Sequence, residues 1–271
     1  MIKKYLLYAF LSVTSIITLI PFIWMLGASF MFDGKASVFP PIFLPDPFTL
    51  IQYKVLFERL NVWRNFFNSL ILSSMVTVLY ITFTSMAGYA FAKYRFKGKK
   101  FLFNLLLSSM IIPSQVTMLP LFLLLKSMGF INTYMAIIIP GLANIFGIFL
   151  IRQYCISIPD SLIEAARMDG ATDFQIYRKV ILPLAVPILV TLAIFSFLGT
   201  WNDFLGPLIY LHNQDLYTVT LGLQSFISRY WTPMNLMMAA ATLAVIPVLV
   251  VFIYAQRFFV EGISITGLSG R

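Results

Sequence analysis

The sequence has few of the residues that build catalytic or metal centres. It contains one cysteine, Cys155, and one histidine, His212, among 271 residues. A single cysteine excludes an internal disulfide, and neither residue has a neighbour at metal-ligand spacing, so Cys155 is expected to be an inert apolar thiol. The apolar segments also lack the paired carboxylates or clustered histidines that general acid–base or metal chemistry requires. We therefore expect no catalytic site, no metal and no cofactor within this chain.

Charge is scarce as well. Charged residues make up 11% of the chain and hydrophobic residues 60%, whereas a soluble domain carries roughly 25% charged residues. The mean hydropathy is +0.89. A bilayer core about 30 Å thick needs roughly 20 apolar residues for each helical span. The composition therefore predicts an all-α integral membrane protein whose outer surface contacts the lipid bilayer.

The sequence also lacks a phosphate-binding loop of the form G-x-x-x-x-G-K-[ST]. Gly34-Lys35 and Gly98-Lys99 have neither the upstream glycine nor the Ser or Thr that must follow the lysine. Any ATP and its Mg²⁺ must therefore bind to another subunit.

Six segments are long and apolar enough to cross a bilayer. The first is not expected to be a signal peptide, because its apolar run exceeds the usual 7–15 residues and no A-x-A site closes it. The chain thus reads as a single transmembrane domain over residues 1–271. The predicted spans are 6–30, 66–92, 101–125, 132–153, 184–207 and 236–259.

The basic residues predict the orientation. The densest basic cluster, Lys93 to Lys100, lies in a short loop, where the positive-inside rule is most reliable. Most other Lys and Arg residues fall on the same side as this loop, which is also the side of both termini. Both termini are therefore predicted to be cytoplasmic. The net charge of +9 does not indicate nucleic-acid binding, because the basic residues flank membrane spans instead of forming one soluble surface.

A polar stretch over residues 154–183 is predicted to be a cytoplasmic loop with its own helices. Ser161 and Glu164 form an S-x-x-E capping box, which predicts a short helix beginning at Leu162. Gly170 can adopt the left-handed conformation that ends many helices.

A second capping box, Thr172 to Gln175, predicts another helix that stops at Pro183. The pattern is therefore helix, glycine elbow, helix. Isolated helices this short are marginal in water, so their apolar residues must pack against the membrane spans or against a partner protein. These residues are Ile163, Met168, Phe174, Ile176 and Tyr177. A well-capped connector with no partner is the alternative.

The residues Glu164-Ala165-Ala166-x-x-Asp169-Gly170-Ala171, followed by Val180-x-Leu182-Pro183, resemble the EAA loop of binding-protein-dependent ABC importer permeases. Three other features resemble the shorter permease of the maltose-type (MalG-like) carbohydrate branch: Asn68-Ser69, Trp201-Asn202 and the segment from Gln256 to Gly262. The resemblance implies a type I ABC importer permease fold in a bacterial inner (plasma) membrane.

The resemblance also implies partner subunits and roles for individual residues. Members of that family work with a second homologous permease, two ATPase subunits and an extracellular solute-binding protein. The resemblance assigns coupling to the ATPase to Glu164, Ala165, Ala166, Asp169, Gly170 and Ala171. The implied function is to form half of the pathway for a carbohydrate or similar polar solute.

Polar side chains inside the spans are candidates for lining that pathway, because buried polar groups are costly in lipid. Asp203, beside Asn202, is considered with them. The alternatives are that Ser and Thr bond back to their own helix and that Asp203 is hydrated at the membrane interface. Pro113 and Pro120 are expected to make the third span irregular. The candidate pathway residues are Asn104, Ser108, Gln115, Asn144 and Asn202.

The solute itself is not encoded in any motif. Permeases for glycerol phosphate or polyols share all of these features and remain alternatives. A secondary transporter is the alternative from another class, but such proteins show intramembrane ionisable residues for ion coupling and internal repeats, and neither is evident.

Overall fold

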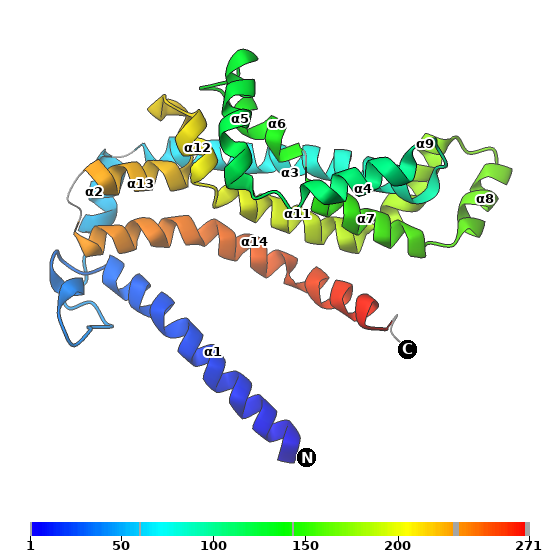
Figure 1. Cartoon of the computed structure of the whole chain (residues 1–271). Coiled ribbons are helices and arrows are strands. Elements are labelled where there is room, and N and C mark those ends of the chain that lie inside the picture. The colour runs from blue at the N-terminus through cyan, green and yellow to red at the C-terminus, as the bar shows by residue number, and fades with distance from the viewer. Residues whose placement is uncertain (1, 60, 143, 230–232, 269–271) are drawn as a thin grey trace. The chain divides into compact units, whose positions relative to one another are not determined.

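The computed structural model describes residues 2–59, 61–142, 144–229 and 233–268, and within these ranges the chain is helical with no β-strand (Figure 1). The chain divides into two compact units. Unit 1 comprises Met1–Phe66 and Val219–Leu249, and unit 2 comprises Phe67–Thr218 and Val250–Arg271.

Four helical segments are long and apolar enough to cross a membrane, and each coincides with a predicted span. The helices that contain the second and the last segment run further than predicted, because helix formation continues beyond the apolar core. The segment Met135–Ser157 contains a helix break at Asn144, the N-cap of its second helix. The segments are Lys3–Ser29 in α1 (Ile2–Ser29), α3 (Val62–Lys93), Met135–Ser157 formed by α6 (Met135–Leu142) and α7 (Ile145–Ser157), and Met234–Tyr254 in α14 (Met234–Leu268).

The predicted span 101–125 is not one continuous helix. It consists of α4 (Lys99–Ser109) and α5 (Ser114–Ser127), which meet at an angle of 105°. The break falls at Pro113, because proline lacks an amide hydrogen and disfavours helical geometry in the residue before it. Pro113 itself has an extended ψ of 136° and is the N-cap of α5. Pro120 lies inside α5 without ending it.

The predicted span 184–207 is also shorter and bent. Its straight part is α11 (Val186–Trp201), which meets the preceding helical segment at 80°. Asn202 is the C-cap of α11, and the chain then turns into the separate helix α12 (Leu205–Tyr210). Asp203 Oδ1 accepts a hydrogen bond from the Gly206 amide at 3.2 Å, which stabilises this turn. Helix α11 therefore ends at the Trp201-Asn202 pair, six residues before the predicted end of the span at residue 207.

Unit 1 has a small core where α1 ends. Ala28 and Met31 are fully buried there, and Met238 packs against them. Asn235 Nδ2 donates to Ala28 O at 3.2 Å, and Gln52 Nε2 donates to Met31 O at 3.1 Å. These side chains donate hydrogen bonds to backbone carbonyls at the end of α1 and just beyond it. The other elements of this unit are η1 (Lys35–Ser37), α2 (Ile51–Arg59) and α13 (Val219–Arg229).

Unit 2 contains the larger core, built from α3, α7 and α11 together with the polar stretch that follows α7. Cys155 is fully buried in it, as its assignment to an apolar thiol predicts. In Figure 1 the short helix α8 (Asp160–Met168) extends beyond the ends of α4 and α7. The buried residues of this core are Tyr80, Tyr89, Ile151, Cys155, Ile158, Ile163, Ile176, Tyr177, Ile181 and Leu192.

Helices α3 and α7 approach closely at Gly88. A Cβ atom at this position would lie 2.5 Å from Ile151 Cγ2 and 3.1 Å from the Arg152 backbone nitrogen. We expect Gly88→Ala to lower the free energy of unfolding by about 1–3 kcal/mol, because the neighbouring backbone must shift. Gly199→Ala is the control, since nothing lies within 4 Å of its Cβ. Thermal unfolding in detergent measures both, and equal destabilisation would contradict this packing.

Candidate functional site

The candidate site is the stretch after α7, residues 159–181, which we call the elbow segment. Its first helix, α8, begins at Asp160, with Pro159 as N-cap and no side-chain capping bond. The predicted start at Leu162 and the capping box at Ser161 are therefore wrong. Pro159 takes the extended ψ of 134° that precedes a helix, and the carboxylate of Asp160 favours the first turn, where the helix dipole is positive.

The glycine elbow is confirmed. Gly170 has a φ of +79°. Its amide donates to Arg167 O at 3.0 Å, and the Ala171 amide donates to Ala166 O at 3.0 Å. These two bonds form the Schellman motif, which satisfies the last carbonyls of α8 and requires a left-handed residue at this position.

The second capping box is also confirmed. Thr172 Oγ1 accepts from the Gln175 amide at 3.3 Å, and Gln175 Oε1 accepts from the Thr172 amide at 2.8 Å. The box opens α9 (Asp173–Ile176), which continues directly into a π-helical turn, η2 (Tyr177–Ile181). Single π turns occur frequently at functional sites.

The predicted stop at Pro183 is wrong. Pro183 lies within α10 (Leu182–Leu184), which follows the π-helical turn directly. The bend falls at Ala185, whose ψ of 0° turns the chain into α11. The elbow segment therefore continues through α10 to the bend at Ala185, and α11 begins directly after the bend.

The inner face of the elbow segment packs on the membrane-spanning helices of its own unit. Ile163 and Ile176 are buried in the core of unit 2. The Tyr177 hydroxyl lies 2.7 Å from Ser85 Oγ of α3, and its ring lies 5.8 Å from that of Tyr89. This part of the predicted packing requirement is met within the chain.

The outer face remains apolar and exposed. Met168 is 88% exposed and Phe174 62%, and Leu162 of α8 is also exposed. Glu164 and Ala165 are exposed beside them. Short helices do not keep large apolar side chains in water without a reason, so this face is suited to a protein partner.

One ion pair crosses the elbow. Arg167 Nη2 lies 3.1 Å from Asp173 Oδ1, linking the end of α8 to the start of α9. The hydrogen bond that Arg167 donates to Asp173, together with the negative charge of that carboxylate, raises the pKa of Arg167 above its ordinary value. Both side chains are more than half exposed, so the pair orients the two helices and adds little stability.

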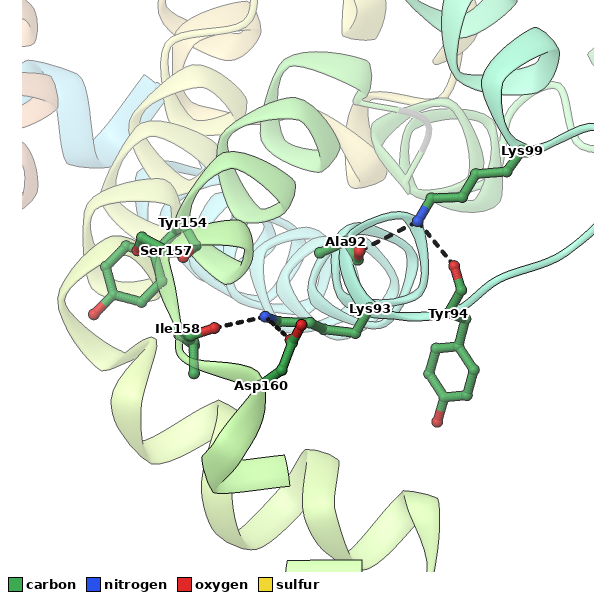
Figure 2. A network of polar contacts seen from close by, with 8 residues as sticks. All are labelled: Ala92, Lys93, Tyr94, Lys99, Tyr154, Ser157, Ile158 and Asp160. Carbon is green, nitrogen blue, oxygen red and sulfur yellow. Dashed lines mark hydrogen bonds and ion pairs between the residues drawn. The ribbon is translucent and has the colours of Figure 1, made fainter. Parts of the chain in front are cut away.

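A second ion pair ties α8 to α3 (Figure 2). Lys93, the last residue of α3, donates from Nζ to Asp160 Oδ1 at 2.5 Å and to Ile158 O at 2.6 Å. The hydrogen bond and charge of Lys93 hold the pKa of Asp160 below its ordinary value of 3.8. A depressed carboxyl pKa means that the pair stabilises the folded state above the unfolded-state pKa. That contribution is lost only as the pH falls through the folded-state pKa, so the pair is fully formed at neutral pH.

Lys93→Met should loosen α8. We expect amide hydrogen exchange in α8 to accelerate by roughly fivefold or more, since the charge-assisted bonds to Asp160 and Ile158 are lost. Lys93→Arg should retain most of the protection, and Lys97→Met, in the adjoining loop, should change nothing. In the unmodified chain the protection should be the same at pH 5 and pH 7 after correction for intrinsic exchange. Equal exchange in Lys93→Met and the unmodified chain would show that the pair does not hold α8.

Two of the predicted pathway residues line neighbouring hollows in unit 2. Gln115 lines a cavity of about 400 Å³, and Asn144 lines one of about 310 Å³. The two cavities share Val76, Gly141, Gly199 and Thr200 in their walls. Asn144 also caps α7, because its Oδ1 accepts from the Gly147 amide at 3.1 Å. The structure therefore brings these two amides to one region.

The other three predicted residues lie elsewhere. Asn104 lines a separate hollow beside Arg152. The Ser108 hydroxyl donates to Asn104 O at 2.8 Å, so it bonds to its own helix, which is the alternative considered for Ser and Thr. Asn202 is exposed at the end of α11, where it is the C-cap.

The cavity walls also contain Thr200 and Ser196, which were not predicted, and Asp203, which was considered beside Asn202. Thr200 lines both cavities, Ser196 lines the smaller one and Asp203 the larger one. Ser196 and Thr200 are four residues apart and so share one face of α11. Thr77 Oγ1 of α3 lies 3.4 Å from Ser196 Oγ. A search for polar residues at helical spacing in the fifth span would have found this face.

An all-helical chain with several apolar membrane-crossing segments, an exposed elbow and polar hollows defines a multi-pass membrane protein suited to transport. Comparison with protein families identifies it further. Residues 84–265, which include the elbow segment, match the model for the binding-protein-dependent transport system inner membrane component. The chain belongs to this family of transport permeases.

Individual relatives agree with this assignment. The arabinooligosaccharides transport system permease protein AraQ of Halalkalibacterium halodurans is 35% identical, over 91% of this chain and 96% of the relative. The lactose transport system permease protein LacG of Rhizobium radiobacter is 31% identical, over 94% and 93% of the two chains. A chain in the crystal structure of a bacterial ABC transporter involved in import of the acidic polysaccharide alginate superposes with a TM-score of 0.82 and 26% identity, covering 95% of this chain and 96% of that one. The chain has the ABC importer permease fold.

Proposed function

We propose that this chain is the permease subunit of an ATP-driven importer for a carbohydrate, and that it forms half of the translocation pathway with a second homologous permease. Two ATPase subunits would bind ATP and Mg²⁺, and an extracellular solute-binding protein would deliver the solute. The observation that carries the proposal is the elbow segment, whose exposed face lies in a chain that has no phosphate-binding loop of its own.

Two roles are proposed for the elbow residues. Glu164, Ala165 and Asp169 are exposed and would contact the ATPase. The other three would fix the shape of that surface. Gly170 provides the turn, and Ala166 and Ala171 pack against the core of unit 2. Movement of the ATPase would then be transmitted through α9, η2 and α10 into α11, because these elements are consecutive in the chain.

An uncharged solute is favoured over an anionic one. The described residues that line the two cavities of Gln115 and Asn144 include no Lys or Arg. An anionic solute such as glycerol phosphate would need basic partners there, and Asp203 would repel it if ionised. Amides and hydroxyls such as Gln115, Asn144 and Thr200 suit the hydroxyl groups of a sugar or polyol. The names of several relatives, arabinooligosaccharide and lactose permeases among them, support a sugar.

The test is reconstitution of the chain with its partner permease, ATPases and binding protein in proteoliposomes. We expect uptake of an oligosaccharide or disaccharide that requires ATP at the ATPase face and does not respond to a proton or sodium gradient. Uptake driven by an ion gradient without ATPase subunits would replace this proposal with a secondary transporter. ATP-driven uptake of glycerol phosphate in preference to every sugar tested would retain the importer and overturn the carbohydrate assignment.

A further inference from the structure

We propose that unit 2 carries a binding site for the headgroup of an anionic phospholipid at the junction of α3, α4 and α7. The site is an open hollow of about 960 Å³. Its basic lining residues are Lys99, Lys100 and Arg152, and its aromatic lining residues include Phe96, Phe101 and Phe103.

The three cations have no carboxylate to neutralise them. No described Asp or Glu forms an ion pair with Lys99, Lys100 or Arg152, and no acidic residue lines the hollow within the described part of the chain. Lys99 also lies within electrostatic reach of Arg152 and Arg95. Like charges gathered without an anion are unfavourable, so the hollow favours an anionic ligand.

The cations differ in their freedom to bind it. Lys99 Nζ donates to Ala92 O at 3.2 Å and to Tyr94 O at 2.8 Å, so it caps the end of α3 (Figure 2). Within the described residues, Arg152 donates one hydrogen bond, from Nε to Phe91 O at 3.2 Å, and its guanidinium lies 4.2 Å from the centre of the Phe103 ring. The remaining donors of Arg152 and the exposed ammonium of Lys100 are therefore available for a phosphate.

The location points to a lipid as the source of that phosphate. The hollow adjoins residues 94–98, which link α3 to α4. Helix α3 is apolar enough to cross a membrane, and α4 is so together with α5, as a pair bent by 105°. A short link between two such segments lies at the level of the lipid headgroups. Phe96 is 41% exposed and Phe101 70%, so an apolar surface for an acyl chain lies beside the cations. Basic pockets between membrane helices commonly hold anionic headgroups.

The test uses the assembled transporter in nanodiscs of phosphatidylethanolamine with a minority of phosphatidylglycerol, followed by native mass spectrometry of the retained lipid. We expect selective retention of phosphatidylglycerol. Retention should fall about tenfold in the double variant Arg152→Gln, Lys100→Gln and about threefold in Lys100→Gln alone. Lys100 is exposed, so the single variant keeps the test valid if the double variant does not fold. Lys97→Gln, in the same loop but outside the hollow, should retain the lipid fully.

Three results would overturn the proposal. Equal retention of both lipids would show that the hollow does not select an anion. Displacement of the lipid by inorganic phosphate would make free phosphate the ligand. If the assembled transporter retains no phosphatidylglycerol and Lys100→Cys is shielded from a water-soluble thiol reagent, a partner protein occupies the hollow instead.

Discussion

Gly170→Ala should reduce coupled uptake by about fivefold to thirtyfold. An L-residue held at a φ of +79° costs about 1–2 kcal/mol. This cost corresponds to a fall of about fivefold to thirtyfold in the ratio of correctly bent to incorrectly bent elbows. Nothing lies within 4 Å of a Cβ at Gly170, so the cost is conformational and not steric. ATP-driven uptake and ATP hydrolysis in proteoliposomes measure the effect, and both should fall while the complex still assembles in the membrane.

Gly129 provides a matched control in the same unit. It has a φ of +73° and open space around its Cβ, and it ends α5 with the same pair of bonds, from the Gly129 amide to Lys126 O at 3.0 Å and from the Phe130 amide to Leu125 O at 2.9 Å. Gly129→Ala should therefore lower stability by the same amount and leave uptake nearly unchanged. Gly170→Asn should restore part of the uptake, because Asn tolerates the left-handed region. An equal loss of uptake in Gly129→Ala and Gly170→Ala would show that the elbow has no special role.

Glu164→Lys should abolish productive contact with the ATPase without destabilising the chain. Glu164 is exposed on α8 and forms no ion pair or hydrogen bond with the described residues, so its replacement should change the free energy of unfolding by less than about 0.5 kcal/mol. Reversing the charge at a partner surface costs far more, because like charges then face each other. We expect at least about a tenfold loss of uptake and of binding-protein-stimulated ATP hydrolysis, equivalent to about 1.4 kcal/mol of interaction.

Two further variants locate that effect. Glu164→Gln should have an intermediate activity, because the amide keeps the shape and loses the charge. Glu58→Lys reverses an exposed charge in α2, where Glu58 pairs with Lys54 at 3.8 Å, and should leave uptake intact. Full activity of Glu164→Lys in an assembled complex would remove the proposed contact at this position.

Local signals explain why the elbow could be predicted. The capping box at Thr172 and the turn at Gly170 depend on residues only three to five positions apart, so the determinants are local in the sequence. The start of α8 could not be predicted in the same way. It is stabilised by Lys93, which lies 67 residues away from Asp160 in the chain and contacts it only after folding. The capping box at Ser161 satisfied a local rule that a tertiary contact overrode.

The membrane-spanning helices were likewise predictable only in part. Hydropathy located the four continuous membrane-crossing segments, because it reports composition over a long window. It did not reveal the 105° angle between α4 and α5, although Pro113 indicated that this span is irregular. It extended the fifth span to residue 207, whereas α11 ends at the Trp201-Asn202 pair, where Asp203 stabilises the following turn. The pathway residues were predicted in part. Gln115 and Asn144 reach neighbouring cavities, but Ser108 bonds within its helix, and only the packed structure distinguishes these outcomes.

The most direct test of the account is site-specific cross-linking from α8 to the ATPase. The one native cysteine, Cys155, is buried, so Ala165→Cys in a Cys155→Ser background gives a single accessible thiol on the outer face of α8. Ser127→Cys, exposed at the end of α5, is the control, because the predicted topology places it on the opposite side of the membrane. We predict a cross-link from residue 165 to the ATPase subunit in the assembled transporter, with a yield that changes when ATP is bound, and none from residue 127. Absence of an ATPase cross-link from residue 165 in an active complex would contradict the account.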